Sequence, residues 1–72
     1  MIEINMKEIG KRIRELRLGQ HMTQTDLARA IGVATNTVTQ YEKGTSKVSI
    51  DVLVNLAEVF DISTDYLLGL ID

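Results

Sequence analysis

The stretch of sequence that decides the fold is QTDLARAIGVATNTVTQYEK, residues 24–43. Its apolar residues recur at the spacing of two short helices, over about 24–31 and 35–43. Gly32 stands between them, where the turn requires a residue that tolerates a positive φ angle. Ala28 supplies the small side chain that two helices crossing at a steep angle need at their contact. The sequence therefore predicts two short helices joined by one tight turn.

This arrangement is a helix-turn-helix pattern, and the exposed face of its second helix carries the first functional signal. At about 100° per residue, Val38 and Tyr41 fall on the core side of that helix. Four polar residues, none of them acidic, fall on the opposite side: Asn36, Thr39, Gln40 and Lys43. Amides can bond bidentately to adenine, and threonine methyls can contact the thymine methyl. We therefore expect this face to read DNA bases; the alternative is an ordinary solvated face, although such faces usually mix glutamate and lysine.

Apolar spacing predicts three more helices, over about 5–18, 50–60 and 64–68, and no strand. In the first of them Gly10 costs up to ~1 kcal/mol relative to alanine, which favours a close approach by a neighbouring helix at that point. The sequence contains no repeat and no internal linker. We therefore expect an all-α fold, a five-helix bundle that contains the helix-turn-helix, with residues 1–72 forming a single domain.

The length of 72 residues and the composition exclude several function classes. Catalytic barrels and doubly wound domains need roughly 200 residues or more. There is no cysteine and only one histidine, His21, so disulfides, thiolate metal sites and multi-histidine metal sites are excluded. No apolar run approaches the ~20 residues of a membrane span. We expect no enzymatic activity, no metal, no cofactor and no membrane partner, and the lack of cysteine fits a cytoplasmic location.

Charge is distributed unevenly along the chain. The net charge of −2 and the isoelectric point near 5.2 argue against a nucleic-acid-binding protein, which often has a value above about 9. However, residues 1–48 hold all eight basic residues and five acidic ones, a net charge of +3. Residues 49–72 hold five acidic residues and no basic one, a net charge of −5. The asymmetry predicts two surfaces with different roles; chance segregation of solvated charges is the alternative.

Five segments of the chain carry a combined motif: RIRELR (12–17), MTQTDLA (22–28), IGV (31–33), VTQYEKG (38–44) and DYLLG (65–69). Together they resemble the phage repressor and Cro family, also called the xenobiotic response element (XRE) regulators of bacteria. The resemblance covers about residues 6–69 and implies a lambda repressor-like domain that binds double-stranded DNA in a sequence-specific way. We expect a transcriptional regulator, and more specifically a repressor; a coactivator-like protein-interaction module on the same fold is the alternative.

The resemblance also implies roles for particular side chains. Base edges of the DNA are expected to be read by Thr35, Asn36 and Gln40, which match family positions, and by Thr39, which is adjacent to them on the same face. DNA phosphates are expected to be bound by Thr23, Gln24, Thr37, Lys43, Thr45 and Lys47. Among these, Gln24 would also brace the recognition helix, and its place at a helix N-terminus is favourable because free N–H groups there attract anions.

Two features concern how the recognition helix is held. The resemblance implies that Arg17 and Glu42 form an ion pair that ties the first helix to the end of the recognition helix; two independent surface charges are the alternative. Ala34 departs from the family, which often has serine or threonine at this capping position. Because alanine cannot cap, at a cost of about 1 kcal/mol, we expect that Thr35 takes over the capping role or that the helix frays at its start.

The C-terminal quarter of the chain predicts self-association. Four apolar residues present more apolar surface than so short a helix is expected to bury in its own domain: Tyr66, Leu67, Leu70 and Ile71. The segment has no basic residue to place on DNA, and a small domain without disulfide or metal gains stability from a partner. We therefore expect a homodimer on an inverted-repeat operator with half-sites ~34 Å apart. The alternative is that these side chains close the core over the first and fourth helices.

Overall fold

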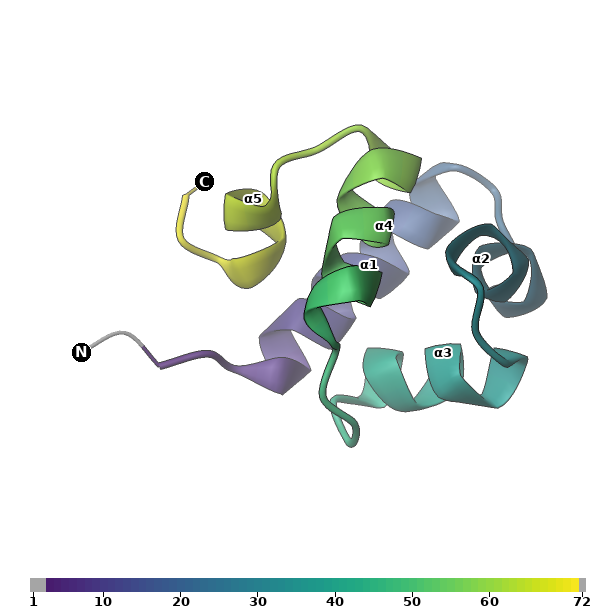
Figure 1. The fold of residues 1–72 in the computed structure, drawn as a ribbon, viewed down its shortest axis with the longest axis horizontal. Coiled ribbons are helices and arrows are strands. Elements are labelled where there is room, and N and C mark those ends of the chain that lie inside the picture. The colour runs from purple at the N-terminus through teal and green to yellow at the C-terminus, as the bar shows by residue number, and fades with distance from the viewer. Residues whose placement is uncertain (1–2, 72) are drawn as a thin grey trace.

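The computed structural model describes residues 3–71; Met1, Ile2 and Asp72, the ends of the predicted 1–72 domain, lie outside the described residues. The elements in chain order are α1 (Met6–Gly19), α2 (Gln24–Ile31), α3 (Thr35–Lys43), α4 (Ile50–Phe60) and α5 (Thr64–Leu68). Residues 3–71 contain no strand, so the prediction of an all-α fold with five helices is confirmed (Figure 1). Only α1 differs from its predicted range, because it begins and ends one residue later.

Local sequence signals explain where most helices begin and end. Side chains at four N-caps accept hydrogen bonds from backbone N–H groups of the first turn: Asn5, Thr23, Ser49 and Ser63. At the start of α2, Asp26 also accepts a hydrogen bond from the backbone N–H of Thr23, which completes a capping box. The turn after α2 passes through Gly32 at φ +74°, a left-handed conformation that glycine adopts without strain. The turn that the sequence predicted is therefore present.

The start of α3 follows neither of the two expected courses. Ala34 makes no side-chain cap, and Thr35 does not take over the role, because its hydroxyl donates to Oγ1 of Thr25 at 3.2 Å. The helix is nevertheless regular from its first turn, where the N–H groups of Thr37 and Val38 donate to the Ala34 carbonyl. The helix therefore forms without a side-chain cap at its start, and it packs against both α1 and α2.

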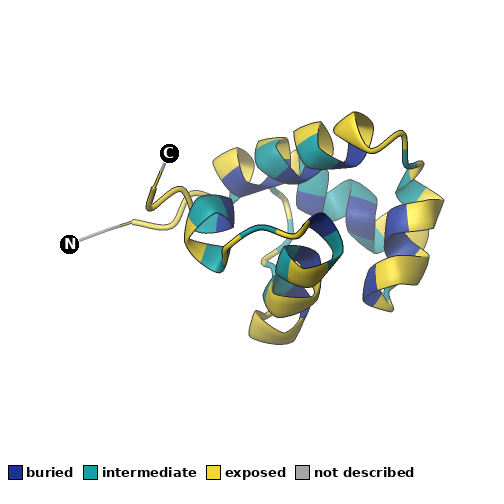
Figure 2. Ribbon diagram, turned by 90° about the horizontal axis from the view of Figure 1, so that it is seen from above, coloured by how far each residue is buried: buried dark blue, intermediate teal, exposed yellow. Residues whose placement is uncertain are grey.

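The helices close into a ring around one apolar core. Contacts link α1 to α3, α3 to α2, α2 to α4, α4 to α5, and α5 back to α1. The buried apolar residues come from all five helices: Ile9, Ile13, Leu27, Ala28, Ile31, Val38, Tyr41, Val52, Leu56, Phe60 and Leu67. Their faces turn toward the interior, and the opposite faces are exposed (Figure 2). The α5 helix thus completes the core where it meets α1 and α4.

Leu67 corrects part of the predicted dimer interface. Its side chain has 0% exposure and belongs to the core cluster, so it has no surface to offer a partner. The sequence placed it on the surface because α5 has only five residues, whose burial depends on how α1 and α4 approach it. For this residue the alternative, closure of the core over the first and fourth helices, describes the structure.

Gly10 sets the distance between α1 and α3. A Cβ atom added at this position would lie 2.2 Å from the carbonyl oxygen of Tyr41 and 2.8 Å from that of Glu42. Real Cβ atoms do not approach backbone oxygen so closely, so only glycine allows α1 to lie directly against the last turn of α3. The close helix approach expected at Gly10 is confirmed, and it fixes the position of the recognition helix.

Candidate nucleic-acid interface

The residues predicted to bind DNA lie on the start of α2, along α3 and in the loop that follows α3. Six of them are exposed: Thr23, Thr35, Asn36, Lys43, Thr45 and Lys47. Four are half-buried: Gln24, Thr37, Thr39 and Gln40. The two helices contact each other and lie at one end of the molecule (Figure 1). The fold therefore brings together residues that are up to 24 positions apart in the sequence.

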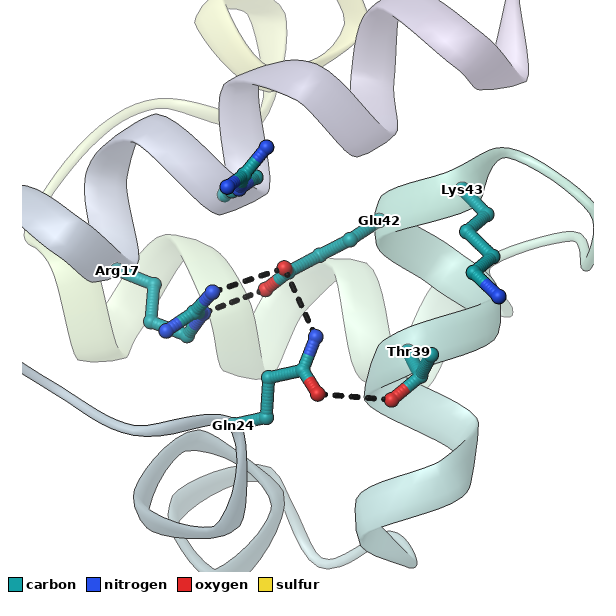
Figure 3. Close-up of a pocket in the computed structure, with 6 residues that line it drawn as sticks. Arg17, Gln24, Thr39, Glu42 and Lys43 are labelled. Atoms are coloured by element: carbon teal, nitrogen blue, oxygen red, sulfur yellow. Dashed lines mark hydrogen bonds and ion pairs between the residues drawn. The ribbon is translucent and has the colours of Figure 1, made fainter.

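A hollow of about 250 Å³ opens between α1, α2 and α3 (Figure 3). Six polar or charged residues line it: Arg14, Arg17, Gln24, Thr39, Glu42 and Lys43. Three predicted DNA contacts thus share this hollow with the predicted ion pair. The other predicted contacts, among them Asn36 and Gln40, are not part of its lining.

Arg17 and Glu42 form a two-pronged ion pair at the inner side of the hollow. The Nε–H group of Arg17 donates to Oε2 of Glu42 at 2.6 Å, and an Nη2–H group donates to Oε1 at 3.0 Å. The side chains are only 10% and 5% exposed, respectively. The hydrogen bonds to Glu42 raise the pKa of Arg17 above its ordinary value; burial opposes this, and the charge of Glu42 adds to it. The two charges therefore do not act independently, and they join α1 to the last turn of α3.

Gln24 extends the ion pair into a network of three helices. Its Nε2–H group donates to Oε1 of Glu42 at 3.2 Å, and its Oε1 atom accepts from the Thr39 hydroxyl at 2.8 Å (Figure 3). The side chain therefore links the first residue of α2 to two turns of α3. This is the bracing contact that the family resemblance implied for Gln24.

Arg14 and Lys43 supply positive charge to the same hollow. Both are exposed, and the one ion pair within residues 3–71 is that of Arg17 with Glu42, so no carboxylate there neutralises either cation. The start of α2 adds backbone N–H groups nearby, which favour anions. Sequence reasoning missed Arg14 as a site residue. The available signal was its place on α1, one turn before Arg17.

Asn36 and Gln40 stand on the exposed side of α3, outside the hollow. No side-chain hydrogen bond is recorded for Asn36 among the described residues, so its amide is available to a ligand. Gln40 is tied to the following loop, since the Thr45 hydroxyl reaches both its backbone carbonyl, at 3.3 Å, and its side-chain oxygen. No hydrogen bond from the side-chain N–H groups of Gln40 is recorded among the described residues, so these donors are available to a ligand.

Exposed apolar side chains gather far along the chain from these polar contacts. Leu70 and Ile71 are 43% and 54% exposed, and Tyr66 is half-buried. A second apolar site lies at the start of α4, where Ile50 is 79% exposed and Val54 is also exposed. Sequence reasoning missed this second site, because Ile50 falls within the apolar stripe of its helix and only the packing shows that it is not covered.

Neither a metal site nor a membrane span is found in the described part of the chain. Between residues 3 and 71, no group of three or more His, Cys, Asp or Glu residues could hold a metal ion. No helix in the same part is long and apolar enough to cross a membrane.

Comparison with known proteins identifies relatives of this arrangement. A family profile described as helix-turn-helix matches residues 13–67, which include both helices of the pattern and the ion pair. An uncharacterized HTH-type transcriptional regulator, YobD of Bacillus subtilis, is 42% identical over 62 residues, which are 86% of this chain and 55% of YobD. The chain thus spans about half the length of this curated relative.

Two solved structures have the same fold. The restriction-modification controller protein C.AhdI of Aeromonas hydrophila superimposes with a TM-score of 0.81 at 31% identity, over 90% of this chain and 98% of C.AhdI. The P22 c2 repressor, solved in complex with a synthetic operator, gives a TM-score of 0.80 at 30% identity, over 83% of this chain and 91% of that protein. The five-helix fold with its helix-turn-helix is therefore that of phage repressors and related regulators.

Proposed function

This chain belongs to the helix-turn-helix family, and we propose that it binds double-stranded DNA sequence-specifically as a bacterial or phage transcriptional regulator that represses its target. The observation that carries the proposal is the acid-free polar face of α3, held in place by Arg17, Glu42 and Gln24 beside two free cations. A recognition helix has to enter the major groove in a fixed orientation, and this network supplies that orientation.

Asn36 and Gln40 are the proposed base-reading amides, with Thr35 and Thr39 beside them on α3. Phosphates on either side of the groove would be bound by Thr23, Gln24, Thr37, Lys43, Thr45 and Lys47, to which we add Arg14. Contacts to phosphate position the protein, whereas contacts to base edges select the sequence. In this proposal, the amides of Asn36 and Gln40 on α3 select the sequence, and the cations Arg14 and Lys43 in the flanking hollow position the protein on phosphate.

The proposed working unit is a homodimer on an inverted-repeat operator. A single recognition helix meets too few base pairs to mark one site among the ~10⁶ or more competing sites of a genome. The exposed side chains of Leu70 and Ile71, with Tyr66 beside them, offer apolar surface at the end of the chain where no basic residue lies. Half-sites would then lie about one helical turn, ~34 Å, apart.

Repression in this proposal requires no catalytic step, because an occupied operator blocks transcription by itself. The chain would therefore act without cofactor or metal, in the cytoplasm where the DNA lies.

Selection from a random duplex library tests the proposal. We expect one enriched inverted repeat, whose binding weakens steeply between roughly 50 and 200 mM salt because phosphate-bound counterions are released. Asn36→Ala should cost about 1–3 kcal/mol on the selected site and little on random DNA, since it removes a base contact. Lys43→Ala should weaken both alike. Failure to enrich any sequence, together with salt-independent binding, would contradict DNA recognition and favour the protein-interaction alternative.

A further inference from the structure

We propose that Thr39 recognises the 5-methyl group of thymine through its own methyl group, and that its hydroxyl takes no part as a donor to DNA bases. This inference rests on the proposed DNA binding and specifies how one position of the recognition helix would read the operator. It follows from the direction of the hydrogen bonds that join Arg17, Glu42, Gln24 and Thr39.

The direction of each hydrogen bond is fixed by the group before it. Arg17 is a donor only, and the ionised carboxylate of Glu42 is an acceptor only. Gln24 therefore has to turn its Nε2–H group toward Glu42, which leaves its Oε1 atom facing Thr39. Because Oε1 can only accept, the Thr39 hydroxyl has to donate to it. The orientation of the Gln24 amide is thus determined by chemistry and not by the choice between two similar atoms.

Thr39 has only one hydroxyl hydrogen, and it is already in use. The hydroxyl oxygen lies 2.8 Å from Oε1 of Gln24 and 3.4 Å from the carbonyl oxygen of Thr35, both of which are acceptors. The side chain consequently cannot donate to N7 or O6 of guanine or to O4 of thymine, the acceptors that the major groove offers. With the hydroxyl hydrogen turned toward Gln24 (Figure 3), the hydroxyl oxygen can only accept, from N6–H of adenine or N4–H of cytosine, and the methyl group is the contact that remains for thymine.

The same hydrogen bond also fixes the place of the methyl group. Threonine is branched at Cβ, so a bound hydroxyl selects one χ1 rotamer and holds the methyl group in one direction. By helical periodicity Thr39 falls on the same half of α3 as Asn36 and Gln40. It is half-buried at the edge of the hollow, and we infer that its methyl group is directed toward the groove. An apolar contact with the thymine methyl is an established form of base readout. The ion pair between α1 and α3 would therefore contribute to sequence selection, because it orients Gln24 and, through Gln24, Thr39.

The test pairs two substitutions with the removal of one methyl group from DNA. Thr39→Val keeps the methyl group and removes the donor, whereas Thr39→Ser keeps the donor and removes the methyl group. Each thymine of the selected half-site is replaced in turn by deoxyuridine, and affinities are measured for parent and both variants. At one position we expect the replacement to weaken parent and Thr39→Val by about four-fold, the factor for one buried methyl group, and to leave Thr39→Ser unaffected.

The possible outcomes are distinct. The inference is overturned if no thymine position affects the parent, or if Thr39→Ser stays as sensitive as the parent at every position. It is also overturned if Thr39→Ser keeps the sequence preference of the parent while Thr39→Val loses the preference for a base that offers a hydrogen-bond acceptor. That result would mean that the hydroxyl group, and not the methyl group, selects the base. The deoxyuridine series on the parent needs no variant, so a folding defect cannot hide the answer. If the parent selects no DNA sequence, the proposed function itself is overturned. If it selects an operator but no thymine methyl group depends on the methyl group of Thr39, only this inference is overturned.

Discussion

The α2–α3 side of the molecule and the α4–α5 side are held together by different kinds of interaction. On the first side, directional hydrogen bonds and one ion pair join residues 17, 24, 39 and 42 across three helices. On the second, the side-chain hydrogen bonds recorded within residues 49–71 are the N-caps of Ser49 and Ser63, and the rest is apolar packing. Directional bonds hold side chains at fixed positions, as base reading requires, whereas self-association needs mainly apolar area.

The largest loss of stability is expected at Gly10, where α1 and α3 are in such close contact that no side chain fits between them. Gly10→Val should unfold the protein, because its Cβ would lie 2.2 Å from the Tyr41 carbonyl oxygen and force α1 away from α3. Gly19→Ala is the matched control on the same helix, since nothing lies within 4 Å of its added Cβ. We expect this control to keep or slightly raise thermal stability, as alanine favours helix by up to ~1 kcal/mol. Circular dichroism melting curves compare the two, and equal stabilities would mean that the α1–α3 contact is not rigid.

The ion pair is expected to give the next largest effect. Glu42→Met leaves the Arg17 guanidinium desolvated without its carboxylate and should cost about 3 kcal/mol of unfolding free energy. Adding Arg17→Met to it should recover part of the loss, because no unpaired buried charge then remains. Denaturant unfolding of both single variants and the double variant completes the cycle. If the single losses simply add, the pair does not constrain α3.

On the α4–α5 side, the third prediction concerns dimerisation through the exposed apolar residues. Leu70→Glu should lower affinity for the operator by about 100-fold or more, since a monomer loses the linked second half-site, while the melting temperature changes little. Ile50→Glu is the control at the other exposed apolar site and should leave dimerisation intact. Sedimentation velocity gives the oligomeric state of each variant. A monomeric Ile50→Glu and a dimeric Leu70→Glu would move the interface to the start of α4.

The sequence predicted local features well, because their causes are local. The apolar period placed five helices, and capping residues such as Thr23 and Ser49 placed their starts almost to the residue. Even the close contact at Gly10 was foreseeable, since a glycine inside a helix needs a reason. Signals of this kind lie within one or two turns of chain.

Features that depend on several helices at once could not be predicted in the same way. Leu67 was expected on a surface and lies in the core, since only the positions of α1 and α4 determine what covers α5. The sequence places Arg14 one turn before Arg17, but it does not show that Arg14 shares a hollow with Lys43, 29 positions away. The orientation of the Thr39 hydroxyl follows from Arg17 through the side chains of Glu42 and Gln24. The spacing of residues along the chain does not show such a series of hydrogen bonds.

The smallest effect is expected at the N-caps of α2 and α4, whose contributions to stability should differ in their dependence on pH. Hydrogen bonds from the backbone N–H and the hydroxyl of Thr23 lower the pKa of Asp26 below its ordinary value of 3.8, with a further contribution from the charge of Arg29. Because the folded pKa is the lower one, the stabilisation is complete above about pH 4 and is lost as the pH falls through the folded pKa. Asp26→Asn should therefore destabilise α2 at about pH 7 and have progressively less effect below about pH 4.

The start of α4 provides the control, because it has a serine cap and no capping box. Ser49→Ala should cost about 1 kcal/mol both at about pH 7 and below about pH 4. Melting curves of both variants and the parent at the two pH values provide the measurement. An Asp26→Asn effect that stays constant with pH would show that the carboxylate charge contributes nothing to the capping box.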